Sequence, residues 1–267
     1  MAEHLEGRQA SPQALETIAK YFPVALVEDA FFQTAHDTLQ ELGFKRDNTF
    51  VLVNTCRDEL ARPISHFFDK HYGHTFNLSG ISGIITAGTL GFIAATSHAP
   101  TNPDGRDKYV FIGATHTAVD ENGKEGAVVR EGQGSVSNAC GAIEAILGEI
   151  HAGTQQNGTI REDNVEYDTL KKKIFAKNLP AHPTNFDLTK ITAQAITHTI
   201  EDHIAKTVDP TKSDYAVIVG VQIHAGVKAG LWTPESVIDY FAPVTSYTVI
   251  KGVKHELKVE GKKLVVA

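Results

Sequence analysis

The sequence predicts an α/β fold: a single domain with a central, largely parallel β-sheet flanked by helices. Three observations lead to this prediction. Short apolar, β-branched runs occur at 49–55, 108–115 and 215–223, which have the length and composition of buried strands. Segments with a helical spacing of apolar residues lie between these runs, and no linker or repeat divides the chain. Strands that alternate with helices are typical of a parallel sheet.

The N-terminal part is predicted to be helical. A helix over 11–22 begins with a Ser-Pro cap, and a second helix covers about 28–42, with Gly43 as its stop. We therefore expect residues 1–48 to form a helical N-terminal arm and residues 49–267 to form the α/β core.

The remaining elements of the core follow from the same periodicities. A helix is expected over 59–72, and the small-residue stretch 77–100 is expected to be tight packing or a loop. Further expected elements are helices over 138–150 and 187–206, a helix that begins at 233, and edge strands or a hairpin over 244–266 with Gly261 near a turn.

The composition excludes several classes of protein. The 267 residues are 42% hydrophobic and 21% charged, which excludes a collagen-like, disordered or coiled-coil chain. The net charge of −7 leaves no overall basic footprint for nucleic acid. No stretch approaches the ~18 apolar residues of a membrane span, and the N-terminus has no secretory signal. We expect no nucleic-acid partner, no membrane span, and a location in the cytoplasm, or in an organellar stroma if a transit peptide was removed.

The two cysteines and thirteen histidines are the unusual counts in this chain. The counts alone allow either a disulfide between Cys56 and Cys140 or a metal ion that both bind. Cys56, His116 and His224 each follow a predicted strand, and ligands bind beyond the carboxyl ends of the strands in an open α/β sheet. Cys140 lies at a predicted helix start, where unpaired N–H groups favour a thiolate.

Cys56, His116 and Cys140 together offer the ligand chemistry of zinc. Thiolates combined with imidazole are a zinc-type ligand set. Three protein ligands with one open position are the arrangement of catalytic zinc sites. The spacing alone fits equally well with two ordinary buried cysteines and a core histidine.

The residues around the cysteines resemble those of a known family. The segment that begins at Cys56 reads Cys-Arg-Asp-Glu-Leu-Ala-Arg, and Cys140 begins Cys-Gly-Ala. These are similar to the Cys-x-Asp-x-Arg and His-x-x-Cys-Gly motifs of β-carbonic anhydrases. Two features differ: a long insertion separates His116 from Cys140, and the arginine after Asp58 comes two positions late, at Arg62. With these differences, the phrase NTCRDELARP resembles the limiting-CO2-inducible protein B/C family, a theta-class relative of the β-carbonic anhydrases.

The resemblance extends from about Phe50 to beyond the third predicted strand, and it implies both a fold and an activity. It implies a β-carbonic-anhydrase-like domain that forms a homodimer, with Zn²⁺ bound by Cys56, His116 and Cys140. It also implies a carbonic anhydrase (a lyase) of carbon concentration, in which zinc-bound hydroxide hydrates CO2 reversibly to bicarbonate. Because some family members are inactive, a catalytically silent zinc protein in a CO2-concentrating assembly is an alternative. A zinc hydrolase with Glu59 as its base is another.

Asp58 and Arg62 are the expected catalytic pair beside the metal. Asp58, two residues after a ligand, would orient the hydroxide, or would ligate zinc itself and close the site. Arg62 faces Asp58 at i+4 if residues 58–62 are helical, and Arg57 is the alternative partner. A surface salt bridge at a helix start is the simpler explanation of the same residues.

His98 is the expected proton shuttle and the rival of His116 as a metal ligand. It follows an apolar, glycine-rich run, and a free histidine titrates near neutral pH. His224 is expected to be a hydrogen-bonded core histidine rather than a ligand. The expected apolar walls of a CO2 pocket are Phe67, Leu90 and Phe92, with Gly88 and Gly91 allowing the backbone to approach the metal.

Overall fold

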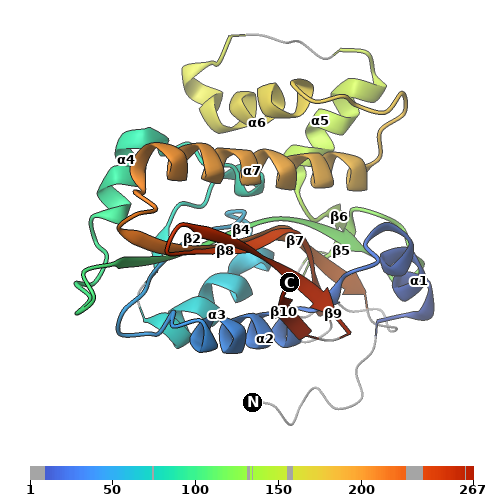
Figure 1. The fold of residues 1–267 in the computed structure, drawn as a ribbon. Coiled ribbons are helices and arrows are strands. Elements are labelled where there is room, and N and C mark those ends of the chain that lie inside the picture. The colour runs from blue at the N-terminus through green and yellow to red at the C-terminus, as the bar shows by residue number, and fades with distance from the viewer. Residues whose placement is uncertain are drawn as a thin grey trace.

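The computed structural model describes residues 10–73, 75–130, 133, 135–154, 159–226, 237–261 and 263–267. Its centre is an eight-stranded sheet in the order β10-β9-β8-β7-β4-β2-β3, with β1 paired to β8 (Figure 1). A two-stranded sheet of β5 and β6 lies beside it. The strands are β1 Leu26–Val27, β2 Phe50–Asn54, β3 Phe76–Asn77, β4 Asp107–Val119, β5 Ala127–Val129, β6 Val136–Asn138, β7 Ser213–Gly226, β8 Val237–Ile250, β9 Val253–Glu260 and β10 Lys263–Val266.

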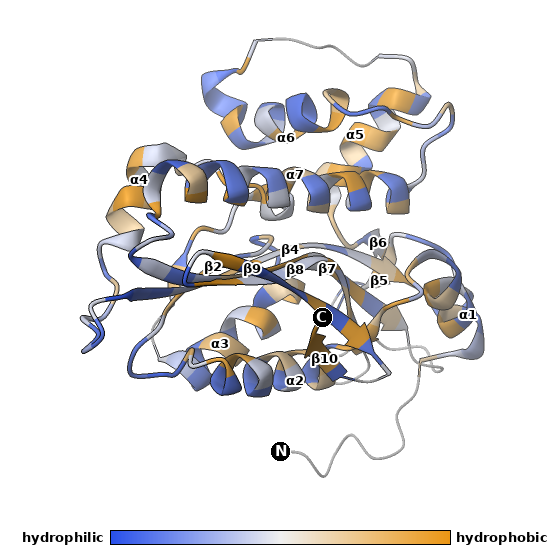
Figure 2. Ribbon diagram, in the orientation of Figure 1, coloured by the Kyte–Doolittle hydropathy of each residue, from blue (hydrophilic) through white to orange (hydrophobic). Residues whose placement is uncertain are grey.

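Helices cover both faces of the sheet, as the α/β prediction requires. In Figure 1, α2 and α3 lie on one face, and α4 and α7 lie on the other, with α5 and α6 beyond α7. Helices such as α2 and α7 carry both hydrophobic and hydrophilic residues (Figure 2), which is typical of helices with one face packed against a core, whereas α4 consists of apolar and small residues. The helices are α1 Pro12–Tyr21, α2 Glu28–Glu41, α3 Arg62–Tyr72, α4 Gly88–Thr96, α5 Gly141–His151, α6 Val165–Phe175 and α7 Asn185–Thr207.

The sheet has a parallel half and an antiparallel half. Strands β3, β2, β4 and β7 are parallel, as expected from the alternation of strands and helices. Strands β8, β9 and β10 continue the sheet in antiparallel order through two hairpins. The second hairpin turns at Gly261, whose φ of 63° is readily adopted by glycine, so the predicted C-terminal hairpin is confirmed.

Two strands are longer than the sequence predicts, and this changes the position of two histidines. Strands β4 and β7 pair in parallel from Asp107↔Ser213 to Val119↔Ala225. His116 and His224 therefore lie inside strands rather than at their ends. The pairing of β2 with β4 stops at Asn54↔Gly113, so the loop after β2 lies beside the continuing part of β4. This mismatch in strand length brings Cys56 close to His116.

The N-terminal segment is part of the same core rather than a separate arm. Phe31 and Phe32 of α2 are fully buried, and both rings lie 4.7 Å from the ring of Phe241 in β8. Strand β1 also pairs with β8. Aromatic packing and strand pairing thus join residues 10–48 to the sheet.

Three local predictions have different outcomes. The small-residue stretch contains a 3₁₀ turn, Ile81–Gly83, followed by helix α4, so part of the expected loop is helical. Helix α6 has no counterpart in the predictions. The helix expected to begin at residue 233 begins outside the described residues, and it is wrong from Val237 onward, where the chain forms strand β8. Within the described ranges, no helix combines the length and apolar character needed to cross a membrane.

Candidate metal centre

Cys56, His116 and Cys140 meet at the carboxyl end of the parallel strands. One ligand atom from each residue lies within 4.8 Å of the others. Cys56 follows β2, His116 lies within β4, and Cys140 is the N-cap residue of α5. We refer to these three residues as the Cys-His-Cys cluster. The sequence-predicted ligand set is therefore brought together by three different elements.

Contacts with the 3₁₀ turn Ile81–Gly83 and the residue before it hold Cys56 in position. Cys56 forms a parallel bridge with Gly80, and the backbone N–H of Ser82 donates to Cys56 Sγ at 3.2 Å. The buried Asn54 side chain donates to the carbonyl oxygen of Gly83. Gly83 has a φ of 78°, and a Cβ there would clash with the Ala114 carbonyl oxygen, so only glycine fits. These contacts attach the loop of Cys56 to strand β4.

The two thiols of the cluster have opposite pKa shifts. Hydrogen bonding from the Cys56 thiol lowers the pKa of Cys140, and the Ser82 side chain and the backbone N–H groups of Ala142 and Ile143 lower it further. The hydrogen bond to Cys140 and burial raise the pKa of Cys56. The shared hydrogen bond therefore favours ionisation of Cys140 over Cys56, and a metal ion that binds both sulfur atoms requires both thiols to lose their protons.

His116 is fully buried and presents one ring nitrogen to the cysteines' side. Its Nδ1 lies 3.1 Å from Nε2 of His224, whereas its Nε2 is buried without a hydrogen-bond partner among the described residues. Burial opposes protonation of His116, but the neighbouring Cys56 and Asp58 side chains outweigh it and raise the pKa of His116. The surroundings of the ring therefore attract positive charge.

The residues present fit a soft divalent metal. Two sulfur donors and one imidazole nitrogen are the ligand types that zinc prefers. The unpartnered Nε2 of His116, within the described part of the chain, is a buried acceptor that a metal ion would satisfy. The two sulfur atoms beside this nitrogen distinguish His116 from the other histidines of the core.

Asp58 lies beside the cluster and pairs with Arg130, which corrects the expected pairing with Arg62 or Arg57. Asp58 Oδ2 lies 2.7 Å from Arg130 Nη2, and the two side chains are 15% and 16% exposed. Asp58 caps a 3₁₀ turn with an extended ψ of 142°, so the α-helical i+4 relation with Arg62 does not exist. Arg62 is exposed at the start of α3, and Arg57 pairs with Glu166 at 2.6 Å.

Arg130 is the residue that the sequence analysis missed. It follows β5 and also bonds to Glu59 Oε1 at 2.8 Å and to the Ala139 carbonyl oxygen at 3.0 Å. The long insertion between His116 and Cys140 is the β5–β6 hairpin, which carries this arginine to Asp58. The insertion itself was visible in the sequence, but no local pattern identifies Arg130 as the partner.

His98 lies at the other end of strand β2 from the cluster. Its ring centroid is 5.9 Å from that of Phe50 and 5.8 Å from that of Phe76. Phe50 begins β2 and Cys56 follows its end, so about 20 Å of extended chain separates His98 from the metal ligands. This position is too distant for the expected direct proton transfer, and it excludes His98 as a rival ligand.

The expected pocket walls also lie elsewhere. Leu90 is 82% exposed on α4, Phe92 stacks on Phe111 and His203, and Phe67 packs beside α2. Gly88 and Gly91 lie on α4 as well. The apolar neighbours of the two cysteines are instead side chains of the 3₁₀ turn and of the helices above it, including Ile81, Ile84, Ile143 and Leu170.

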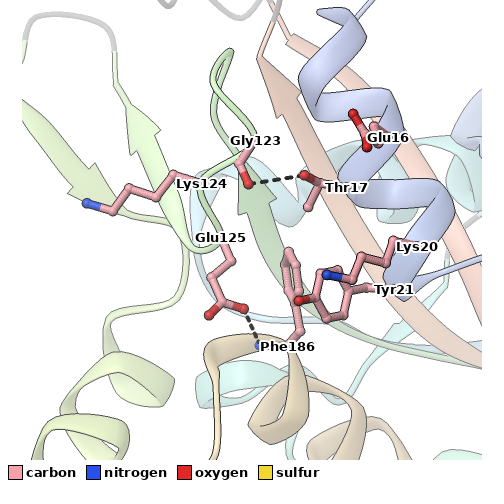
Figure 3. A pocket seen from close by; sticks show the side chains of 8 residues that line it. All are labelled: Glu16, Thr17, Lys20, Tyr21, Gly123, Lys124, Glu125 and Phe186. Atoms are coloured by element: carbon pink, nitrogen blue, oxygen red, sulfur yellow. Dashed lines mark hydrogen bonds between the residues drawn. The ribbon is translucent and has the colours of Figure 1, made fainter.

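A surface pocket of about 440 Å³ lies apart from the cluster (Figure 3). It is formed by α1, the turn before β5 and the start of α7. Its walls carry two lysines and two glutamates beside the rings of Tyr21 and Phe186. Because these charges cancel, the pocket does not select a ligand by charge.

Comparisons with known proteins agree with this site and fold. The family model described as limiting CO2-inducible proteins B/C, β carbonic anhydrases, matches residues 25–250. The crystal structure of limiting CO2-inducible protein LCIB is 29% identical, with a TM-score of 0.71, and the match covers 90% of this chain and 96% of that one. The structure of its homologue PtLCIB4 is 23% identical, with a TM-score of 0.72 and coverage of 91% and 98%, and shows the same fold. A search of curated proteins gives no match.

Proposed function

The chain belongs to the limiting CO2-inducible protein B/C family of β carbonic anhydrases, and we propose that it is a zinc enzyme that hydrates CO2 reversibly to bicarbonate. The single observation that carries this proposal is the buried Cys-His-Cys cluster with the Asp58–Arg130 pair beside it. The family match alone does not establish activity. The donor set, together with an ionised carboxylate next to it, is what CO2 hydration requires.

The protein's own residues have three tasks in this proposal. Cys56, His116 and Cys140 hold the metal, which when bound lowers the pKa of water and so makes a nucleophile available near neutral pH. Asp58 accepts a hydrogen bond from the nucleophile and orients it toward the carbon of CO2. Arg130 holds the Asp58 carboxylate in place through a charge-assisted hydrogen bond.

The apolar side chains near the cluster suit an uncharged substrate. Ile84 and Ile143 are buried against Cys140, and Ile81 packs beside them. CO2 has no charge for a protein to recognise, so an apolar surface beside the nucleophile is an appropriate binding surface. Bicarbonate is charged, and the same surface favours its release.

The structure argues against the hydrolase alternative. Glu59 was the candidate base for that reaction, but its carboxylate pairs with Arg130 and its side chain is 56% exposed. A carboxylate that is ion-paired with Arg130 and exposed to solvent is poorly placed to take a proton from a nucleophile at the metal. The catalytically silent alternative would use the same cluster, so it differs from our proposal only in rate.

Stopped-flow CO2 hydration by zinc-loaded protein across pH tests the proposal. We expect hydration that depends on zinc and that rises as pH increases, since the nucleophile must be deprotonated. Activity that appears only at alkaline pH would indicate that Asp58 closes the site by ligating zinc. Zinc-loaded protein that is inactive at every pH would establish the silent alternative. Family membership also leads us to expect a homodimer, which light scattering would detect.

A further inference from the structure

A chain of three hydrogen-bonded side chains leads away from the Cys-His-Cys cluster. His116 Nδ1 lies 3.1 Å from His224 Nε2, and His224 Nδ1 lies 2.8 Å from Asp239 Oδ1. The three residues come from the adjacent strands β4, β7 and β8. His224 is directly opposite Asp239 in the β7–β8 register. The sheet itself therefore determines the spacing of the chain.

The hydrogen-bond chemistry of this chain has one consistent assignment of protons for neutral rings. An ionised carboxylate only accepts hydrogen bonds, so Nδ1 of His224 must carry its proton. Nε2 of His224 is then an acceptor, and Nδ1 of His116 must donate to it. As a result, Nε2 of His116 has a lone pair and no proton, which is the form that a metal ion needs.

Burial protects this arrangement of protons from competition with solvent hydrogen bonds. His116 is 0% exposed and His224 is 1% exposed, so water does not compete for their ring nitrogens. Asp239 keeps a 23% exposed side chain at the outer end of the chain. The nearby carboxyl group of Glu28 has a raised pKa because of burial and the negative charge of Asp239.

We propose that His224 and Asp239 are positioning residues of the metal site, which fix the tautomer and the ring orientation of His116 so that its Nε2 points at the metal. This inference rests on the metal site of the proposed function and deepens it. Outer partners of metal-binding histidines have this role in general, and their loss costs about 10–100-fold in metal affinity. Within the described residues, this series of hydrogen bonds ends on the unpartnered Nε2 of His116, beside the sulfur atoms of Cys56 and Cys140.

Zinc affinity of three variants, measured by competition with a chelator, tests the proposal. His224→Leu removes the acceptor, and we expect a loss of about 10–100-fold in zinc affinity. His224→Gln keeps an acceptor and a donor in the side chain, and we expect affinity within a few-fold of the wild type. Asp239→Asn allows the opposite tautomer of His224, and we expect about a 10-fold loss, because a wrong tautomer disables a histidine without moving it.

A matched control and a second readout separate positioning from general destabilisation. His203→Leu removes another buried histidine, which stacks on Phe92 in the α7 region rather than contacting His116. We expect its zinc affinity to equal that of the wild type. In Co²⁺-loaded protein, the absorption bands of thiolate-bound cobalt should shift in His224→Leu and in Asp239→Asn, and stay unchanged in His203→Leu.

The outcomes distinguish this inference from the proposed function. Wild-type zinc affinity and an unchanged cobalt spectrum in folded His224→Leu would overturn the positioning role, while CO2 hydration could still be present. If His224→Leu does not fold, the same result in Asp239→Asn would overturn it. Wild-type protein that binds zinc but does not hydrate CO2 would overturn the proposed activity and leave the positioning role intact. Wild-type protein that binds no metal would overturn both.

Discussion

The Arg106–Asp214 pair at the amino ends of the parallel strands and the Cys-His-Cys cluster at their carboxyl ends contrast in how completely their polar groups are paired. At the amino ends, Arg106 donates to Asp214 at 2.7 Å and to the carbonyl oxygens of Thr211 and Ser213, and the Lys251 N–H also donates to Asp214. At the carboxyl ends, two thiols and a histidine lie together, and within the described ranges His116 Nε2 has no partner.

The difference supports our proposal that the Cys-His-Cys cluster binds a metal ion, whereas the Arg106–Asp214 pair stabilises the fold. A largely buried ion pair, hydrogen-bonded to several backbone groups, joins strands β4 and β7 and the β8–β9 turn. A buried acceptor without a partner costs about 1–3 kcal/mol, so it persists where a ligand repays that cost. We call the amino ends of the strands, with the Arg106–Asp214 pair, the satisfied edge. We call the carboxyl ends, with the Cys-His-Cys cluster, the unsatisfied edge. Each variant below changes a residue at one of these two ends or serves as a control for it.

The largest effect is expected from removing a ligand at the unsatisfied edge. Cys140→Ser and His116→Ala should each lower zinc affinity by more than the ~100-fold expected of an outer partner. CO2 hydration should fall to the rate of metal-free protein. Zinc content after dialysis and stopped-flow rates check this. A His116→Ala protein that keeps one tightly bound zinc per chain would show that the ligand assignment is wrong.

The next effect separates chemistry from metal binding at the same edge. Asp58→Asn keeps the size of the side chain but removes its charge, so it should retain zinc and lose about 100-fold or more in CO2 hydration. Arg130→Ala should also lower the rate, because Asp58 then lacks its ion-pair partner at 2.7 Å. Arg62→Ala is the matched control, since Arg62 is exposed and Asp58 pairs with Arg130 instead. A rate for Arg62→Ala as low as that for Arg130→Ala would contradict the pairing.

A moderate effect on stability alone is expected at the satisfied edge. Burial would raise the pKa of Asp214, but the hydrogen bonds from Arg106 and the Lys251 N–H outweigh it and lower that pKa. The stability that the Asp214 carboxylate contributes to the folded state is therefore complete above its unfolded pKa of about 3.9. It is lost as pH falls through the lower pKa of Asp214 in the folded state. Asp214→Asn should cost about 1.5–3 kcal/mol at pH 7.

Urea unfolding of Asp214→Asn and wild type at neutral and acidic pH measures this difference. The gap in unfolding free energy should shrink at acidic pH, where Asp214 of the wild type becomes protonated. Zinc affinity should be unchanged, since the pair lies at the opposite end of the strands. A gap that widens toward acidic pH would contradict the assigned ion pair.

The smallest effect is expected at His98. His98 is exposed and about 20 Å of strand away from the cluster, so His98→Ala should change stability by no more than about 0.5 kcal/mol. Zinc content and CO2 hydration should equal those of the wild type. A hydration rate that His98→Ala lowers and that added imidazole buffer restores would show that protons do leave through this residue.

The sequence was sufficient for the fold class and the ligand set because both depend on local signals. β-branched runs marked β2, β4 and β7, and the two cysteines stood at a strand end and a helix start. The extent of β4 could not be predicted, because Thr117 to Val119 are held in the strand by their pairing with β7 rather than by their own composition. Arg130 was missed because its ion pair joins residues 72 positions apart through a hairpin.

Two further errors have the same origin in tertiary structure. Residues 58–62 were expected to be α-helical, but Asp58 caps a 3₁₀ turn instead, and this removes the contact with Arg62. His98 follows a run that looks like part of a site, yet α4 places it beside Phe50 at the start of β2.

His224 was expected to be a hydrogen-bonded core residue, and it is buried with both ring nitrogens hydrogen-bonded.

The central claim is that the metal at the unsatisfied edge makes this chain a carbonic anhydrase. The most direct test is the rate of CO2 hydration as zinc is titrated into metal-stripped protein. We predict that the rate rises linearly with added zinc and reaches its plateau at one zinc per chain. Protein that takes up one zinc per chain and hydrates CO2 no faster than the stripped protein would contradict the claim.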